Sequence, residues 1–361
     1  MEYTTQRLAY LANKRFSDIL RDGFRLFIQS YGTLILPLAF FQVLLITLDI
    51  FLLTDFRLFI NNLGATYTAI MDKFFENITL TDAEWNFLAY FLFLDIILLF
   101  LQNLIGATII TIAMCSVSAY VFKRFMKEDI SLKESFKLAF NKKIFLVILI
   151  IGILLPLSSI LLFVPAVIIF GFFIFLVFTF NMDGNKKPIS EARSIAKGAF
   201  WKIIGVFIVN VLIIYIVSYF VNLLFNILLN TDSAIFISSF NSWHDPATRN
   251  YTMIFLFNLL ISLVDIIFAP LFICLLTVLF SCLKAKRDLI KQHQIGYSPV
   301  TEIYREQYPK QQESKELIAP IPPEIKLEIQ GRFYCPFCGV IIDSPKKFCP
   351  RCGENLSFIK E

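Results

Sequence analysis

Long apolar runs alternate with short charged segments along most of the chain. These runs lie at about 32–53, 86–122, 144–182, 200–230 and 251–283. A membrane-spanning helix needs about 20 apolar residues. The run 144–182 is about twice that length, and its segment PLSSILLFVP (156–165) contains two prolines that favour a turn. We therefore predict six transmembrane helices, at about 32–53, 86–122, 144–160, 164–182, 200–230 and 251–283.

The segments between the runs differ sharply in their basic residues. Together, residues 1–31, 123–143, 183–202 and 284–291 hold 21 lysines and arginines. The segments 54–85, 156–165 and 231–250 together hold three. Loops rich in lysine and arginine stay in the cytoplasm. Six spans place every basic segment on one side, so we predict a multi-pass protein of the cell membrane with both termini cytoplasmic.

The composition agrees with a lipid environment. Hydrophobic residues make up 57% of the 361 residues, 41 of them Phe, and the mean hydropathy is +0.70. Charged residues make up 17%, against roughly 25% in soluble domains. A single soluble core of this length could not bury so much apolar surface. The sequence thus predicts an all-α integral membrane protein.

Three polar segments precede the first, third and fifth spans and resemble one another. They are FSDILRDGFRLFIQSYG (16–32), SLKESFKLAFNKKIFL (131–146) and PISEARSIAKGAFWKIIG (188–205). Each has an acid followed by a small residue, at Asp22-Gly23, Glu134-Ser135 and Glu191-Ala192. In the third, apolar residues recur at i, i+3 and i+4, which predicts an amphipathic helix on the cytoplasmic membrane surface. We therefore expect a membrane domain at 1–290 made of three units, each an interfacial helix followed by a hairpin of two spans.

One of these segments also carries a family resemblance. The stretch FTFNMDGNKKPISEARSIAKGAFWKIIGV resembles the recurring segment of the glycerophosphodiester phosphodiesterase membrane-domain family and its polytopic relatives. The positions that match its pattern are Pro188, Ala192, Ala196, Phe200, Trp201 and Lys202. The resemblance covers about residues 15–290 and implies a polytopic helical domain. The catalytic activity of the family belongs to a separate soluble barrel, so the resemblance does not imply that activity here.

The stretch 333–356 contains two CPxCG motifs. They supply Cys335, Cys338, Cys349 and Cys352, with ten residues between the pairs. Two such pairs bind one Zn²⁺ in a closed tetrahedral site, which is structural rather than catalytic. So short a segment cannot bury a core of its own, and zinc would supply the folding free energy. We predict a zinc ribbon at 333–356, joined to the membrane domain by a flexible linker at 291–332.

Two other chemistries remain open for these cysteines, namely two disulfides or an iron site. Disulfides need an oxidising compartment. Because the basic segments place the tail in the cytoplasm, zinc is the favoured interpretation.

Three acids lie within the apolar runs: Asp49, Asp95 and Asp265. We expect that no basic residue within a span pairs with them. A charge inside a membrane costs roughly 2.5–3.5 kcal/mol and often marks a functional position. Asp95 and Asp265 are therefore candidates for an intramembrane polar site, and we expect Pro270 to kink the helix that carries Asp265.

Two interpretations of these acids stay open. They could line a polar path for an ion, a proton or a lipid headgroup. They could instead join helices as protonated carboxyls, together with amides such as Gln102, Asn103 and Asn258.

The functional expectation follows from what the chain contains. Motifs of known enzyme classes, such as GxSxG, HExxH or a glycine-rich phosphate loop, do not occur in it. The sequence favours a non-enzymatic membrane protein whose zinc ribbon docks a cytoplasmic protein partner and which organises the bilayer. The alternative is a transporter or lipid-handling protein with a polar intramembrane site, and a membrane enzyme acting on lipid headgroups is a third interpretation. Nucleic acid is not an expected partner, because the ribbon lacks a dense surface of basic and aromatic residues.

Overall fold

The computed structural model describes residues 8, 10–161, 163–182, 187–230, 233–296, 333–334 and 341–342. The chain divides into two compact units, one of Phe16–Ser281 and one of Met1–Arg15 with Cys282–Glu361. Among the described residues, four helices are long and apolar enough to cross a membrane, or five if one bent pair counts as a span. This confirms the prediction of an all-α multi-pass membrane protein at its coarse level.

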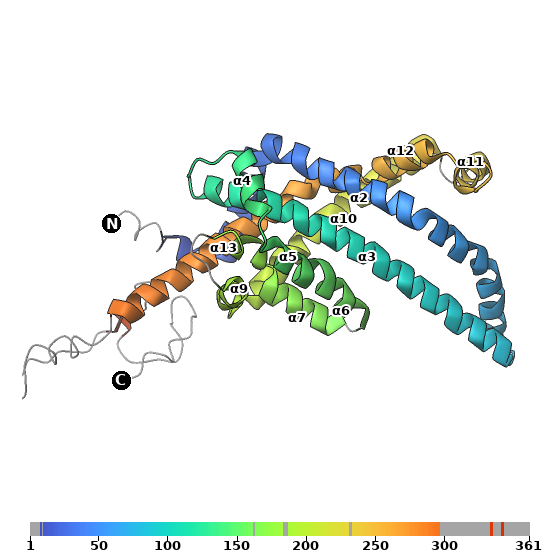
Figure 1. Cartoon of the computed structure of the whole chain (residues 1–361), viewed down its shortest axis with the longest axis horizontal. Coiled ribbons are helices and arrows are strands. Elements are labelled where there is room, and N and C mark those ends of the chain that lie inside the picture. Colours follow the sequence, from blue (N-terminus) through green and yellow to red (C-terminus); the bar gives the residue numbers. More distant parts are fainter. Residues whose placement is uncertain are drawn as a thin grey trace, which may run out of the picture. The chain divides into compact units, whose positions relative to one another are not determined.

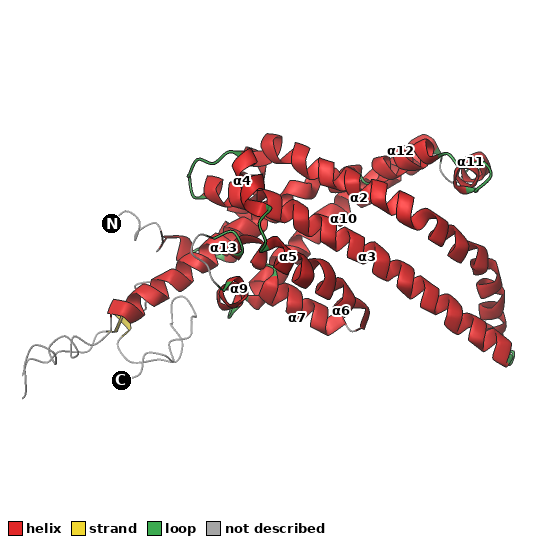
Figure 2. Ribbon diagram, in the orientation of Figure 1, coloured by secondary structure: helices red, strands yellow, loops and turns green. Residues whose placement is uncertain are grey.

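The chain folds into a succession of helices (Figure 1). In order they are α2 (Phe16–Phe75), α3 (Asp82–Phe125), α4 (Leu132–Ala139), α5 (Ile144–Val147), the π-helical η1 (Ile148–Leu154), α6 (Leu155–Leu161), α7 (Phe163–Phe173), α8 (Leu176–Thr179), α9 (Pro188–Ala196), α10 (Phe200–Leu229), α11 (Ala234–His244), α12 (Tyr251–Ile261) and α13 (Leu263–Gly296). The loops that join them are short (Figure 2).

α2 and α3 pack against each other as a long antiparallel hairpin. α2 has 60 residues and α3 has 44, about 90 and 66 Å at 1.5 Å per residue. The segment 54–85, which we expected to connect two spans, is therefore helical over most of its length. The physical reason is an apolar stripe that continues beyond Asp55, since Ile60 of α2 joins a buried cluster with Leu94 and Leu98 of α3.

The tip of this hairpin is fixed by side-chain contacts. Thr81 and Glu84 form a reciprocal capping box that starts α3. Lys73 Nζ near the end of α2 pairs with Glu84 Oε1 at 2.7 Å. These contacts hold the two helix ends together and explain why α3 begins several residues before the apolar run.

The run 144–182 folds back on itself, with α6 packed next to α7. Its two apolar arms, Ile144–Ser159 and Val164–Thr179, are each about 24 Å long at 1.5 Å per residue. That is shorter than the bilayer core of about 30 Å. A hairpin returns to the side from which it started whatever depth it reaches, so the basic residues before and after it share one side.

The run 251–283 is interrupted at Ser262, where α12 ends and α13 begins. α13 contains Pro270 within its length, and the kink that we expect there stays a prediction. The Ser262 backbone still bridges the break, because its N–H donates to the Asn258 carbonyl and its carbonyl accepts from the Ile266 N–H, both at 3.0 Å. The run 200–230, by contrast, forms the single helix α10.

The most deeply buried core gathers where the second arms of the three hairpins meet. Phe280 of α13 lies at its centre, with its ring 5.6 Å from that of Phe122 on α3. The rings of Phe175 and Phe178, at the start of α8 and within it, lie 5.4 and 4.7 Å from the Phe280 ring. Other residues of α3, α8 and α13 are fully buried, among them Cys115, Val117, Val121, Leu176, Leu276 and Leu279. Dense apolar packing therefore joins the three hairpins at this end.

The three related polar segments use their small residues in the same way. A Cβ on Gly23 would lie 2.5 Å from Leu275 Cδ2 of α13. The fully buried Ser135 of α4 donates to the Ser116 carbonyl of α3 at 2.8 Å. Ala192 is fully buried on α9, which packs on α7 and α8. Each segment thus lies against the second arm of a hairpin, as three related units would.

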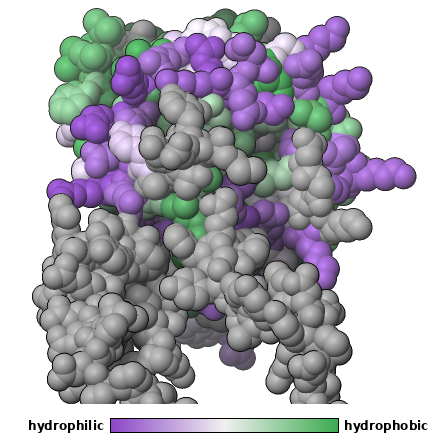
Figure 3. Space-filling view, turned by 90° about the vertical axis from the view of Figure 1, so that its left-hand side faces the viewer, coloured by the Kyte–Doolittle hydropathy of each residue, from purple (hydrophilic) through white to green (hydrophobic). Residues whose placement is uncertain are grey.

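The first of these segments differs from the expected separate interfacial helix. Residues 16–32 are the beginning of α2 itself, whereas α4 and α9 are short independent helices. In the space-filling view of Figure 3, hydrophilic residues predominate among the coloured atoms, with hydrophobic ones between them. This agrees with a polar end that faces water.

Candidate functional site

The four cysteines predicted to bind zinc lie outside the described residues. The strands β1 (Phe333–Tyr334) and β2 (Ile341–Ile342) are described, and they pair antiparallel with Phe333 opposite Ile342. In the sequence they flank the first CPxCG motif. Over the described residues, no group of three or more His, Cys, Asp or Glu side chains is placed to hold a metal ion. The zinc site therefore stays a prediction.

The two acids proposed for an intramembrane site are both exposed on their helices. Asp95 lies on α3 beside the buried Leu94. Asp265 lies in the first turn of α13, directly after the break at Ser262. A functional role for either acid remains a prediction.

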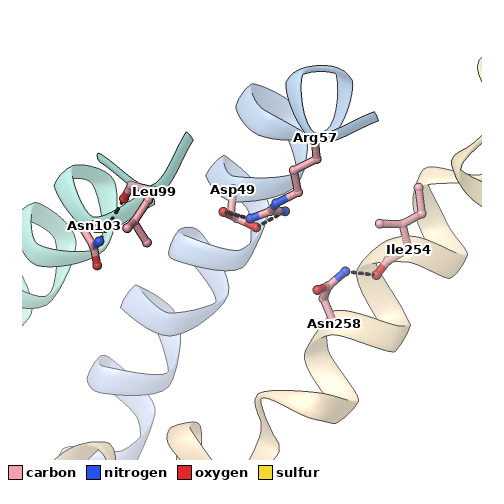
Figure 4. A network of polar contacts seen from close by, with 6 residues as sticks. All are labelled: Asp49, Arg57, Leu99, Asn103, Ile254 and Asn258. Atoms are coloured by element: carbon pink, nitrogen blue, oxygen red, sulfur yellow. Dashed lines mark hydrogen bonds and ion pairs between the residues drawn. The ribbon is translucent and has the colours of Figure 1, made fainter. Parts of the chain in front are cut away.

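Asp49 has a basic partner, contrary to our expectation. Arg57 Nη1 and Nη2, two turns further along α2, donate to the two carboxylate oxygens of Asp49 at 2.8 and 2.7 Å (Figure 4). With the Gln102 carboxamide of α3 turned so that its oxygen faces Arg57, that oxygen accepts from Nη2 at 2.6 Å and from Nε at 2.9 Å. The continuation of α2 beyond the expected end of the span is what places Arg57 within reach.

A second ion pair joins α2 to the start of α12. Arg249 Nη2 lies 2.6 Å from Asp55 Oδ1, and Arg249 Nη1 donates to the Tyr251 hydroxyl at 3.0 Å. The hydrogen bonds to Asp55 and Tyr251 raise the pKa of Arg249 above its ordinary value, so the guanidinium keeps its charge. The Phe51 and Tyr251 rings stack beside this pair at 5.4 Å.

A cavity of about 650 Å³ lies between α2, α11 and α12, and we call it the α2–α12 pocket. Its polar lining comprises Thr54, Arg57, His244, Asp245 and four asparagines, Asn61, Asn62, Asn241 and Asn258. Its apolar lining includes Ile50, Leu58, Phe240, Ile254, Phe257 and Ile261. The pocket is within the 300–1,000 Å³ typical of small-molecule sites.

Helical spacing explains why these side chains share one space. Ile50, Thr54 and Asn61 recur along one face of α2, as Ile254 and Asn258 do on α12. Ile46 and Ile50 pack against Ile254 and close one end. In Figure 4, Asn258 projects from the side of α12 that faces α2, and its Nδ2 donates to the Ile254 carbonyl at 2.8 Å. The Asn258 carboxamide oxygen is therefore left to accept from a ligand.

The residues of α2 that line the pocket change from apolar to polar along the helix. Ile50 lies at one end, with Asn61 and Asn62 at the other, about 17 Å apart along the helix at 1.5 Å per residue. An amphiphile has this same division between an apolar body and a polar head. The arrangement can therefore hold such a molecule.

Comparisons with known proteins found no match among family models, curated proteins or solved structures. The resemblance of residues 178–206 to the membrane-domain family accordingly stays a prediction.

The sequence indicated only some parts of the pocket and of the Asp49–Arg57 contacts. Asn258 and Gln102 were expected to be polar residues within the bundle, and the structure gives both of them partners. Arg57, Asn61 and Asn62 were assigned to a connecting segment, where they carried no signal. The eight-residue spacing of Asp49 and Arg57 would have indicated a pair only if the helix was known to continue.

Proposed function

We propose that this chain is a non-enzymatic membrane protein that binds a polar-headed amphiphile, a membrane lipid in the simplest case, in the α2–α12 pocket. The chain crosses the cell membrane as three hairpins, with six spans and both termini in the cytoplasm. The two arms of the second hairpin are shorter than the bilayer core, and local thinning of the bilayer accommodates them. The sequence analysis gave lipid handling as an alternative, with Asp95 and Asp265 as the polar site. The proposed site is instead the α2–α12 pocket.

The α2–α12 pocket is the observation that carries the proposal. The apolar run of α2 begins near residue 32, and Thr54 follows about 33 Å further on at 1.5 Å per residue. The bilayer core is about 30 Å thick, so the polar half of the pocket falls at the outer headgroup level in this topology. An apolar end at acyl-chain depth and a polar end at headgroup depth match a lipid.

Site-specific photo-crosslinking tests this function. A photoreactive amino acid replaces Asn258, which lines the pocket, and in a second variant it replaces Asn103 on the exposed face of α3. We expect Asn258 to capture one lipid class well above its share of the membrane, and Asn103 to capture lipids in bulk proportion. The same bulk mixture at both positions would contradict a lipid site.

The Cys₄ motif favours a second function, in which a zinc ribbon on the cytoplasmic side of the membrane docks a cytoplasmic protein. Such a ribbon is a structural zinc site without an open coordination position. A bilayer-organising role would then come from the three hairpins and the short helices α4 and α9 at the membrane surface.

Metal analysis of the purified full chain tests the ribbon. We expect one zinc ion per chain, lost in a Cys349→Ser/Cys352→Ser variant. Cys115 is fully buried in α3, and the control Cys115→Ala is expected to keep the zinc. Iron in place of zinc, or cysteines that are oxidised and metal-free in the protein from cells, would contradict the zinc assignment.

A further inference from the structure

We propose that the α2–α12 pocket selects a neutral, polyhydroxylated headgroup, such as the sugar of a glycolipid, over phosphate-containing headgroups. This inference rests on the proposed lipid-binding function and names its ligand class. It follows from the charges, the amides and the rings of the pocket lining.

The positive charge of Arg57 is neutralised by Asp49 of the same helix. One two-donor edge of its guanidinium, Nη1 with Nη2, holds the Asp49 carboxylate. The other edge, Nη2 with Nε, faces the Gln102 oxygen. Phosphate is characteristically bound by arginine through two parallel hydrogen bonds from such an edge. Since both edges are occupied, Arg57 contributes little to the recognition of an anion.

The other charged groups near the pocket do not favour an anionic ligand. Asp245 lines the exposed rim, and its Oδ1 accepts from the Ala247 N–H at 2.8 Å. The nearby Arg249 is paired with Asp55. His244 lines the pocket and uses Nδ1 in a contact with the Phe240 carbonyl at 2.9 Å. The Asp245 carboxylate and the paired arginines therefore disfavour a phosphate, and a neutral headgroup fits these groups better than an anionic one.

Amides are the main recognition groups that remain. Four asparagines line the pocket: Asn61, Asn62, Asn241 and Asn258. A carboxamide both donates and accepts hydrogen bonds. A sugar hydroxyl does the same, so amides distributed along the pocket match a polyol without needing charge. Thr54, whose residue is 6% exposed, adds a hydroxyl of the same kind.

Aromatic rings flank the amides. Phe240 and Phe257 line the pocket with ring centroids 5.2 Å apart, and the Phe240 and His244 rings lie 4.4 Å apart. A sugar presents apolar C–H faces as well as hydroxyls, so ring faces beside amides suit it. The apolar end near Ile50 and Ile261 leaves space for the start of an acyl chain.

Fluorescence of Trp243 offers a direct assay. Trp243 packs beside Phe240 and Phe257, with ring centroids at 6.2 and 6.4 Å. In a full-length Trp85→Phe/Trp201→Phe variant it is the one tryptophan left, since the chain has three. The variant is placed in phosphatidylcholine nanodiscs with increasing mole fractions of a lipid whose acyl chains are brominated, so that a lipid in the pocket quenches the indole. The lipids compared are a diglucosyl diacylglycerol, phosphatidylcholine and phosphatidylglycerol.

We expect the diglucosyl lipid to quench Trp243 fluorescence at a mole fraction about tenfold lower than either phospholipid. A tenfold difference in affinity is roughly what one or two additional hydrogen bonds to the headgroup contribute. Asn258→Leu should raise that mole fraction about tenfold. Asn103→Leu is the matched control, because Asn103 Nδ2 makes the same local bond, to the Leu99 carbonyl at 2.9 Å, on an exposed face away from the pocket lining. It should leave the quenching curve unchanged.

The other outcomes separate the two proposals. If a phospholipid quenches at the lowest mole fraction and Asn258→Leu abolishes this, the lipid site stands and the sugar selectivity is overturned. If all three lipids quench only in bulk proportion, both proposals fall. A soluble disaccharide is added in a further arm. If the disaccharide displaces the brominated lipid, the pocket recognises a polyol and its ligand is a free sugar. If it does not, the ligand is the glycolipid.

Discussion

At the scale of single residues, Asp49 and Arg57 explain how charge is tolerated in a largely apolar helix. The two groups neutralise each other at 2.7 and 2.8 Å, with Gln102 completing the contacts of the guanidinium. The sequence located Asp49 near the end of an apolar run, but the partner depended on where the helix ends. Residue types and local spacing did not indicate where α2 ends, because its extension depends on packing against α3.

Removing Arg57 alone is expected to destabilise the protein. Breaking a buried ion pair leaves one uncompensated charge and costs about 3–5 kcal/mol. The side chains of Arg57 and Asp49 are 34% and 25% exposed, so water compensates in part and we expect about 1–3 kcal/mol for Arg57→Gln. The free energy of unfolding is measured by denaturant titration in detergent micelles.

The double variant Asp49→Asn/Arg57→Gln supplies the control. It removes both charges and should be more stable than Arg57→Gln alone. A double variant as unstable as the single one would show that the pair makes no specific contribution.

At the scale of elements, the helices were predictable and their ends were not. Long apolar runs indicated α3, α10 and the folded-back arms from α5 to α8. The extension of α2 to Phe75 and the break at Ser262 could not be predicted, because both depend on which neighbouring helix covers the segment. The small residues of the repeated segments were visible in the sequence, whereas their burial against α13, α3 and the α7–α8 arm required the fold.

Two glycines on α2 test this close packing. An alanine Cβ at Gly23 would lie 2.5 Å from Leu275 Cδ2 and 3.1 Å from Leu275 Cα. The Leu275 backbone would have to shift, so we expect Gly23→Ala to cost about 1–3 kcal/mol of folding free energy. Thermal unfolding in detergent measures the change.

Gly32→Ala is the matched control on the same helix. No atom lies within 4 Å of its Cβ position, and alanine favours a helix interior over glycine by up to about 1 kcal/mol. We expect an unchanged or slightly higher unfolding temperature. Equal effects of the two substitutions would contradict a tight α2–α13 contact at Gly23.

At the scale of the whole molecule, the proposed membrane topology depends on the distribution of lysine and arginine. The sequence indicated an all-helical membrane protein because apolar residues exceed what a soluble core can bury, and the described helices agree. The candidate pocket was not predictable in the same way, since its lining comes from α2, α11 and α12, segments far apart in the chain. The proposed topology places that pocket at the outer headgroup level and the basic segments on the cytoplasmic side.

Labelling of intact cells with a membrane-impermeant maleimide tests this topology most directly. Asn62→Cys places a thiol on the exposed rim of the pocket, and Lys197→Cys places one on the exposed residue after α9. Peptide mapping locates the label. We predict that Cys at position 62 reacts in intact cells and that Cys at position 197 reacts only after the membrane is permeabilised, with the unsubstituted chain unlabelled from outside. Labelling of position 197, or of the ribbon cysteines, in intact cells would contradict the account.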